Sequence, residues 1–223
     1  MGIEILYRAL CLIGGYCFGL FQTAYIIGKM HHIDIREYGS GNSGTTNALR
    51  VLGKRVGAAV LLGDVLKCIV ACLIARIIFN HLNPDCTILM VIYTGFGVVL
   101  GHIFPFYMHF NGGKGVASIA GVIISLLDWR IMVICLLEFA IVVAITRYVS
   151  LGSILLMVVL VASYSIFVFV DPEFYHIGGE YRIESIIVLV LLGALSIFMH
   201  RKNIGRLLRG KENKLGQKKP VNS

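Results

Sequence analysis

A run of small polar residues punctuated by glycine extends from Gly39 to Arg50, with the sequence GSGNSGTTNALR. Three glycines within six residues give the backbone access to positive φ and let a ligand approach its amides closely. The short side chains between and after them, which include Ser40, Asn42 and Asn47, offer hydrogen-bond donors and acceptors. Arg50 adds a planar cationic fork suited to phosphate. Because long apolar segments flank this run, we interpret it as an anion-binding loop at a membrane surface.

A second glycine-rich loop, GGKG at residues 112–115, leads directly into an apolar segment that begins near Val116. Such a loop before a helix presents free backbone amides and the positive end of the helix dipole, and Lys114 adds a point charge. These features suit a phosphate cradle. A flexible turn with one lysine on the cytoplasmic side of a membrane is the plainer interpretation, and the loop alone does not decide between the two.

Two further polar clusters could complete such a site. The sequence RYVSLGS, which begins at Arg147, offers a cation and two hydroxyls, although Ser150 alone suggests an ordinary helix N-cap. The chain later reads HRKNIGRLLRGKE, and in a helix His200, Asn203 and Arg206 would share one face. That face could orient an acyl carbonyl or a hydroxyl and bind phosphate. A plain basic helix beside the membrane is the alternative.

The composition places most of the chain in lipid. Of its 223 residues, 57% are hydrophobic and only 14% are charged, and the mean hydropathy is +0.84. A soluble domain carries about a quarter charged residues. The formal net charge is +8, and eight of the lysines and arginines fall in the last 24 residues. We interpret this basic end as facing cytoplasm or anionic lipid rather than nucleic acid.

Seven apolar segments predict an all-α, polytopic membrane protein with about seven transmembrane helices. A helix needs about 20 residues to cross a hydrocarbon core ~30 Å thick. The segments are Ile5–Ile27, Val56–Phe79, Thr87–Ile103, Val116–Leu127, Ile131–Thr146, Leu151–Val170 and Ile183–Met199. The fourth is the shortest, and it is a candidate half-helix preceded by a loop that dips into the membrane.

Lysine and arginine fall on alternate connections, which predicts an outside N-terminus and a cytoplasmic C-terminus. The connection Asn80–Cys86 has neither residue, and Asp171–Arg182 has three acids against one arginine. With this orientation all four polar clusters meet on the cytoplasmic side, whereas clusters scattered by chance would divide between the faces. We therefore expect one active site at that face. We also expect a single catalytic membrane domain over residues 1–200 and a basic tail over 201–223, whose start belongs to the site.

Ionisable residues inside apolar segments are functional candidates because hydrocarbon makes them costly. Asp64 and Lys67 lie three apart on one helical face and could form a structural ion pair or contact substrate. Glu138 has neither a partner nor a role from sequence. The six cysteines contain no C-x-x-C pair, so neither disulfides nor a zinc site is predicted.

A transporter is the main alternative from another class, since anion-binding loops occur there too. Transporters usually show repeated halves and polar residues near the middle of the membrane, whereas the polar clusters here gather at one surface. Two other classes of lipid enzyme lack support. The aspartate-rich motif of CDP-alcohol phosphotransferases and the serine–arginine and histidine motif of lipid phosphatases are both missing from the sequence.

Taken in order, these motifs resemble those of the bacterial integral-membrane acyl-phosphate:glycerol-3-phosphate acyltransferases. The first loop resembles the pattern G-S-G-N-x-G-A-T-N-x-x-R, with Thr45 where alanine is usual. Residues 101–117 resemble G-H-x-F-P-x-F-x-x-F-x-G-G-K-G-V-A, and residues 200–212 resemble H-x-x-N-I-x-R-L-x-x-G-x-E. The stretch Asp64–Lys67 resembles D-x-x-K-G, with Cys68 replacing the glycine. The matches span nearly the whole chain.

The resemblance implies transfer of a fatty acyl group from acyl phosphate to the sn-1 hydroxyl of glycerol 3-phosphate, giving lysophosphatidic acid and phosphate, at the start of phospholipid synthesis in the bacterial inner membrane. It implies no cofactor or metal, and neither acyl-CoA nor acyl carrier protein as direct donor. The expected catalytic residues are Ser40, Arg50, Lys114, His200 and Asn203. The expected substrate- and phosphate-binding residues are Gly41, Asn42, Gly44, Asn47, Lys67, Gly112, Gly113, Gly115, Ser150, Ser153 and Arg206.

The sequence offers no obvious general base. Soluble and monotopic acyltransferases use a His-x4-Asp pair, and no such spacing occurs in this chain. An acyl phosphate carries basic oxygens beside the carbonyl that is attacked. Our hypothesis is therefore substrate-assisted catalysis, in which the donor phosphate accepts the hydroxyl proton while the protein positions and neutralises charge. His200 is the base in the alternative.

Overall fold

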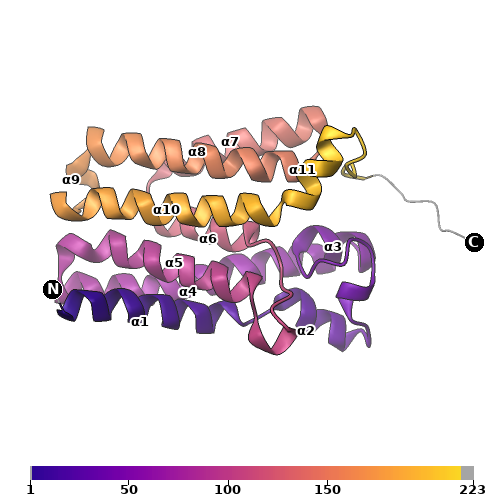
Figure 1. Ribbon diagram of the computed structural model, residues 1–223, viewed down its shortest axis with the longest axis horizontal. Helices are drawn as coiled ribbons and strands as arrows, with labels where there is room; N and C mark the ends of the chain where they lie inside the picture. Colours follow the sequence, from indigo (N-terminus) through magenta and orange to yellow (C-terminus); the bar gives the residue numbers. More distant parts are fainter. Residues whose placement is uncertain (1, 217–223) are drawn as a thin grey trace, which may run out of the picture.

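The computed structural model describes residues 2–216, and throughout that range the chain forms helices, turns and loops without a strand (Figure 1). This confirms the all-α prediction. The α-helices are α1 (Gly2–Gly19), α2 (Thr23–Met30), α3 (Thr45–Val51), α4 (Lys54–Leu82), α5 (Thr87–Ile103), α6 (Val116–Ser125), α7 (Trp129–Thr146), α8 (Val149–Val170), α9 (Pro172–Tyr175), α10 (Gly179–Met199) and α11 (Arg201–Leu208). Single 3-10 turns are η1 (Ile35–Glu37), η2 (Pro84–Cys86) and η3 (Phe106–Met108). The end of the predicted basic tail, 217–223, lies outside the described residues.

Within that range, six stretches of helix are long and apolar enough to cross a membrane. Five correspond to single predicted segments with extended ends, and the sixth combines α1 and α2. The remaining segment forms α6, which has only 10 residues. At 1.5 Å per residue α6 covers about 15 Å, half of a hydrocarbon core. It is therefore the short helix that the sequence predicted, and six stretches, not seven, are long enough to cross a membrane within the described residues.

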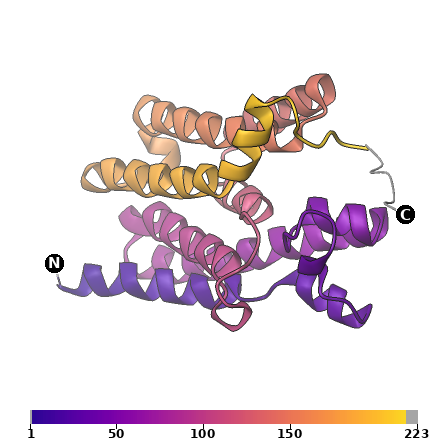
Figure 2. The same cartoon turned by 45° about the vertical axis from the view of Figure 1, so that its right-hand side comes forward.

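The long helices form two groups with α6 between them (Figures 1 and 2). Helices α1, α4 and α5 pack together in one group, α7, α8 and α10 lie in the other, and α5 also contacts α10. A continuous buried apolar cluster links the groups through α6 and includes Cys68, Val91, Ile119, Leu160 and Leu189. Many leucine, isoleucine and valine side chains on the outer sides are exposed, as a lipid-facing surface requires.

Backbone-to-backbone contact joins α1 to α5. Gly15 and Gly19 on α1 face Gly97 and Gly101 on α5. A Cβ added at any of the four would lie only 2.1–2.3 Å from a carbonyl oxygen of the opposite helix. Glycines spaced four apart let membrane helices approach closely. We infer that a larger residue at any of these positions would separate the two helices.

The first apolar segment is divided, whereas the sequence predicted one uninterrupted helix over Ile5–Ile27. The helix breaks between α1 and α2, and carbonyls freed at a break within a membrane need donors. Lys67 of α4 donates to the carbonyl of Phe21 at 2.7 Å, and the Gln22 amide donates to that of Gly19 at 3.2 Å. Gln22 lies in the break itself, whereas Lys67 is a donor from α4, and the local sequence does not reveal that second contact.

The polar clusters lie at one end of the bundle, where Figure 1 shows α2, α3 and α11, and the N-terminus lies at the other. At the far end, ion pairs and hydrogen bonds connect neighbouring helices. Buried Asp128 caps α7 and accepts hydrogen bonds from Arg130 at 2.9 Å and from the Tyr175 hydroxyl. Arg130 also bonds Asp171 at 2.8 Å. These contacts fasten the ends of α7, α8 and α9 together.

Candidate active site

Asn47 organises the first glycine-rich loop. Its amide nitrogen donates to the carbonyls of Ile35 and Tyr38, at 3.0 and 3.1 Å. Its Oδ1 accepts from the backbone amide and hydroxyl of Ser40, at 2.8 and 3.1 Å. A Cβ at Gly39 would meet the same Oδ1 at 2.3 Å. Both amide hydrogens are thus used, so Asn47 shapes the loop while Ser40 remains on its exposed side.

Two of the three loop glycines have the predicted positive φ, Gly39 at 63° and Gly41 at 71°. Gly44 is extended, with φ −130°, and serves as the N-cap of α3. Asn42 between them is half-buried. Arg50 lies in the last turn of α3 and is exposed, and the loop therefore ends in an accessible cation.

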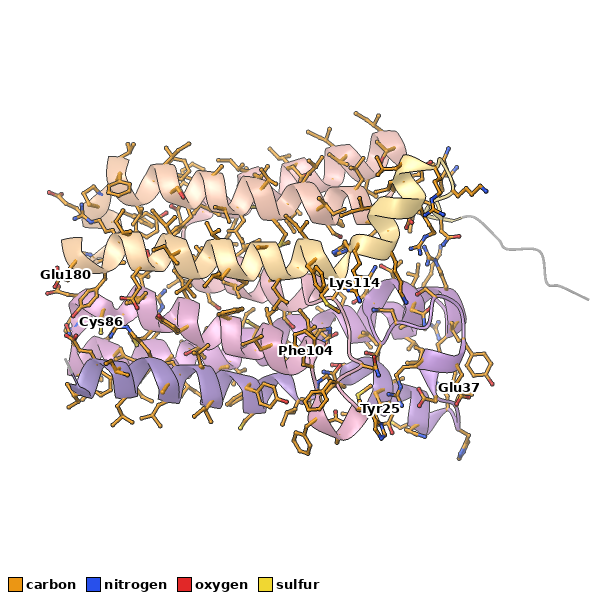
Figure 3. All side chains as sticks on the ribbon, viewed as in Figure 1. Tyr25, Glu37, Cys86, Phe104, Lys114 and Glu180 are labelled. Carbon is orange, nitrogen blue, oxygen red and sulfur yellow. The ribbon has the colours of Figure 1, made fainter. Side chains whose placement is uncertain are left out.

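A hydrogen-bonded network centred on Glu212 joins α8, α11 and the second glycine-rich loop. One Glu212 oxygen accepts from Ser150 Oγ at 3.1 Å and from Asn203 Nδ2 at 2.8 Å, and the other accepts from Arg206 Nε at 2.7 Å. Asn203 Oδ1 in turn accepts a short hydrogen bond from Lys114 Nζ. Figure 3 shows Lys114 where the two helix groups meet, close to the start of α11. Four predicted residues from distant parts of the sequence are therefore brought together.

Positive charge dominates this network. The pKa of Lys114 is lowered to about 8, chiefly by burial and also by the charges of Arg206 and Arg50, while Glu212 acts in the opposite direction. Burial alone would raise the pKa of the Glu212 carboxyl, but hydrogen bonds from Arg206 and Asn203 hold it below its usual value. Three cations thus surround one carboxylate, and that excess suits a phosphate group.

His200 is buried at the junction of α10 and α11. Its Nδ1 lies 2.8 Å from the carbonyl of Ser196, and because a carbonyl only accepts, Nδ1 carries the ring proton. Burial and, to a smaller extent, the nearby Lys114 ammonium lower the pKa of His200 to about 4. The ring is therefore neutral at pH 7, with Nε2 as its acceptor.

The second loop folds back on the end of α5. The amides of Gly112 and Gly113 donate to the carbonyls of Ile103 and His102, both at 3.0 Å. Gly115, with φ 83°, is the N-cap of α6. The first helical bond of α6 runs from Ile119 to Gly115, so the preceding amides of this helix have no intrahelical partner. This is the geometry expected of an anion-binding helix start.

Some predicted site residues lie apart from the network. Lys67 is buried, and its ammonium contacts internal groups. The hydroxyl of Ser153 donates to the carbonyl of Val149 within α8, at 2.8 Å. Ser150 is not the N-cap that its type suggested, because α8 begins at Val149, two residues earlier than such a cap requires, with Tyr148 as its cap. The Ser150 hydroxyl instead donates to Glu212.

Two residues that the sequence analysis did not assign to the site are Glu212 and His102. Glu212 centres the network, and His102 contacts both Lys67 and the second loop. Both occupy defined positions in the motifs quoted above, and Glu212 is an acid in a strongly basic stretch. Either feature could have identified these residues as site candidates from the sequence. Across residues 2–216, no group of three His, Cys, Asp or Glu side chains is arranged to hold a metal ion.

The fold and the site define an integral membrane protein with two glycine-rich loops and a cluster of cations at one end of its helix bundle. The profile of the family described as "Glycerol-3-phosphate acyltransferase" matches residues 9–210. The glycerol-3-phosphate acyltransferase of Clostridioides difficile is 41% identical over 218 residues, which is 97% of this chain and 100% of that protein. The one from Halalkalibacterium halodurans is 41% identical over 211 residues, covering 94% and 96%. The chain therefore belongs to the glycerol-3-phosphate acyltransferase family.

Solved structures agree with this assignment. The crystal structure of PlsY (YgiH), an integral membrane glycerol 3-phosphate acyltransferase, in its glycerol 3-phosphate form, aligns with a TM-score of 0.78 and 33% identity. It covers 94% of this chain and 96% of that one. A second structure of that enzyme, in its lysophosphatidic acid form, aligns with a TM-score of 0.75.

Proposed function

We propose that this protein transfers a fatty acyl group from acyl phosphate to the sn-1 hydroxyl of glycerol 3-phosphate and releases lysophosphatidic acid and inorganic phosphate. The observation that carries the proposal is the network in which Lys114, Asn203 and Arg206 converge beside His200. Both substrates bear a phosphate, and two glycine-rich loops with cations, one ending in Arg50, lie at this end of the bundle. The relatives' names support the acceptor, and the donor is our inference.

The side chains suggest a division of labour. The first loop offers Ser40 and Arg50, supported by Gly41, Asn42, Gly44 and Asn47, for one phosphate. The second offers Lys114 with Gly112, Gly113 and Gly115, assisted by Ser150 and Arg206, for the other. Asn203 uses only one of its two amide hydrogens on Glu212, so the second is available to an acyl carbonyl.

In the proposed step the sn-1 oxygen attacks the acyl carbonyl carbon, and the bond from that carbon to the phosphate oxygen breaks. The hydroxyl proton passes to a phosphate oxygen and leaves with inorganic phosphate. His200, with a pKa of about 4, is a weak base at pH 7. The better proton acceptor is the donor phosphate, and His200 Nε2 serves to orient the hydroxyl. The surrounding cations stabilise the developing negative charge.

We place this activity at the cytoplasmic face of a bacterial inner membrane. The proposal rests on the alternation of lysine and arginine among the connections and on the gathering of polar clusters at one end. Residues 1–200 act as one catalytic membrane domain, and the basic segment 201–223 contributes its first helix to the site. No metal, cofactor, acyl-CoA, acyl carrier protein or nucleic acid takes part, and membrane lipid surrounds the acyl chain.

The test uses purified protein, labelled glycerol 3-phosphate and either palmitoyl phosphate or palmitoyl-CoA. We expect labelled lysophosphatidic acid from the acyl phosphate alone, and its loss in Lys114→Ala and Arg50→Ala. Product from the thioester alone would overturn the donor assignment. Absence of product from both donors, with uptake of label into sealed vesicles, would favour a transporter instead.

A further inference from the structure

Lys67 is the centre of a buried polar network within the helix bundle. Its ammonium lies 2.9 Å from Asp64 Oδ1, 2.7 Å from the carbonyl of Phe21 and 2.9 Å from His102 Nδ1. The predicted ion pair with Asp64 is thus present, with His102 added to it. An ammonium has three hydrogens and no acceptor. A fourth acceptor, the carbonyl of Gly19, lies farther away at 3.5 Å. Because the ammonium can only donate, His102 must accept at Nδ1 and carry its proton on Nε2.

The opposite edge of the His102 ring packs against the second glycine-rich loop. A Cβ built on Gly113 would lie 2.0 Å from His102 Nε2, so that only glycine fits against the ring. The amide of Gly113 donates to the His102 carbonyl at 3.0 Å. The same carbonyl accepts from the fully buried amide of Gln22 at 3.0 Å. His102 is therefore held on three sides: by Lys67, by Gln22 and by the loop.

The residue after Gly113 is Lys114, whose ammonium bonds Asn203 on the other helix group. The backbone carbonyl of Lys114 also accepts from Ser196 Oγ at 3.3 Å. A shift of Gly113 away from His102 would consequently move the Lys114 backbone relative to α10 and α11. The buried network and the site are joined by a single peptide unit.

We infer that Lys67 and His102 are positioning residues, which hold Gly113 against the imidazole so that Lys114 projects toward Asn203. The kinetic consequences rest on the proposed function, whereas the placement of Lys114 does not. Lys67 lies away from the site, so its influence on substrate is indirect, through His102 and Gly113.

A steric exchange tests the contact. Gly113→Ala should collide with the ring, and His102→Ala should remove the ring and make room for the new methyl group. The readout is the rate at which an amine-reactive ester labels Lys114 without substrate, measured by mass spectrometry. We expect Gly113→Ala to raise the rate at least about fivefold, and His102→Ala/Gly113→Ala to return it more than halfway. Gly193→Ala is the matched control, because a Cβ there meets its nearest neighbour at an ordinary 3.5 Å.

Lys67→Met supplies the second arm. We expect faster labelling of Lys114 and a KM for glycerol 3-phosphate raised at least about tenfold, while kcat changes less than threefold. Loss of kcat and folded yield alone, with wild-type labelling in the surviving protein, would mean a purely structural role and overturn the inference. The inference would also be overturned if the labelling rate of the double variant showed the product of the two single effects, since His102→Ala and Gly113→Ala would then act independently. If wild-type protein forms no product, the proposed function fails while the labelling results still decide the inference.

Discussion

Among the individual side chains of the site, Lys114 is subject to two opposing requirements. In the proposed function its ammonium must be buried enough to face Asn203, yet charged enough to attract phosphate. Burial moves its pKa to about 8, so at neutral pH most molecules keep the charge and a small change in pH alters it. Sequence identified the lysine and the asparagine, 89 positions apart. It could not pair them, because their distance is set by helix packing and by the fold of a glycine loop.

The pKa of Lys114 predicts a pH effect on substrate affinity. Above pH 8 the free enzyme loses this charge, so the KM for glycerol 3-phosphate should rise, by up to about tenfold per pH unit. Bound phosphate favours the charged form, so kcat should persist to higher pH than kcat/KM. Steady-state kinetics from pH 6.5 to 9.5 measure both. Lys114→Arg should remove the alkaline limb, and a limb that persists in this variant would assign it to another group.

His200 provides a second prediction, on the proton acceptor. Because its pKa is about 4 in the free protein, kcat/KM should show no limb near 6.5, the value of a free imidazole, that depends on His200. His200→Gln should reduce kcat less than about 100-fold and leave the pH profile unchanged, since a positioned base contributes 10²–10⁴-fold. A loss above 1,000-fold, together with disappearance of an acidic limb, would instead identify His200 as the general base.

Among the elements, the positions of α11 and of the segment after it depend on long-range contacts, which hydropathy does not predict. Hydropathy predicted the long helices to within a few residues, and Thr87–Ile103 matches α5 at both ends. The break after Gly19 escaped prediction because its donors come from α4 and a buried glutamine. The role of Ser150 was also missed, since an N-cap is judged from local sequence and its partner, Glu212, lies 62 residues away.

We predict that Glu212 holds α11 in place. Glu212→Ala removes three partners at once, and we expect a loss of about 1–2 kcal/mol in docking, reduced by the nearby solvent. Because the pKa of Glu212 is lowered in the folded protein, this stabilisation is present above its usual pKa and is lost as pH falls through the folded value. Hydrogen exchange of Arg201–Leu208 should accelerate in the variant and at low pH. Glu173→Gln, at an exposed position, is the control. Equal hydrogen exchange of α11 in both variants would argue against a role of Glu212 in holding this helix.

For the whole molecule, the charge pattern predicts which end faces the cytoplasm. Lys202 lies on α11 and Glu173 on the far end of the bundle, and both are exposed. Lys202→Cys should react with a membrane-impermeant maleimide in inside-out vesicles, and Glu173→Cys in right-side-out ones. The converse pattern would place the end of the bundle that carries α11 outside. The distribution of lysine and arginine indicates which side of the membrane a connection faces, but not how deep a segment lies. The length of α6 could therefore be predicted from its apolar segment, but its position in the bundle could not.

The close glycine contact between α1 and α5 can form only after both helices have been synthesised. Gly15 and Gly97 touch through their backbones, yet more than 80 residues of chain separate them. At translation rates of about 5–20 residues per second, α1 emerges roughly 4–16 s before its partner. During that interval its glycine face has no helix to meet, and the carbonyls at its break wait for Lys67. Helix α4, which also packs against α1, emerges before α5. The glycine face of α1 must therefore be covered by lipid or by the insertion machinery until α5 reaches it.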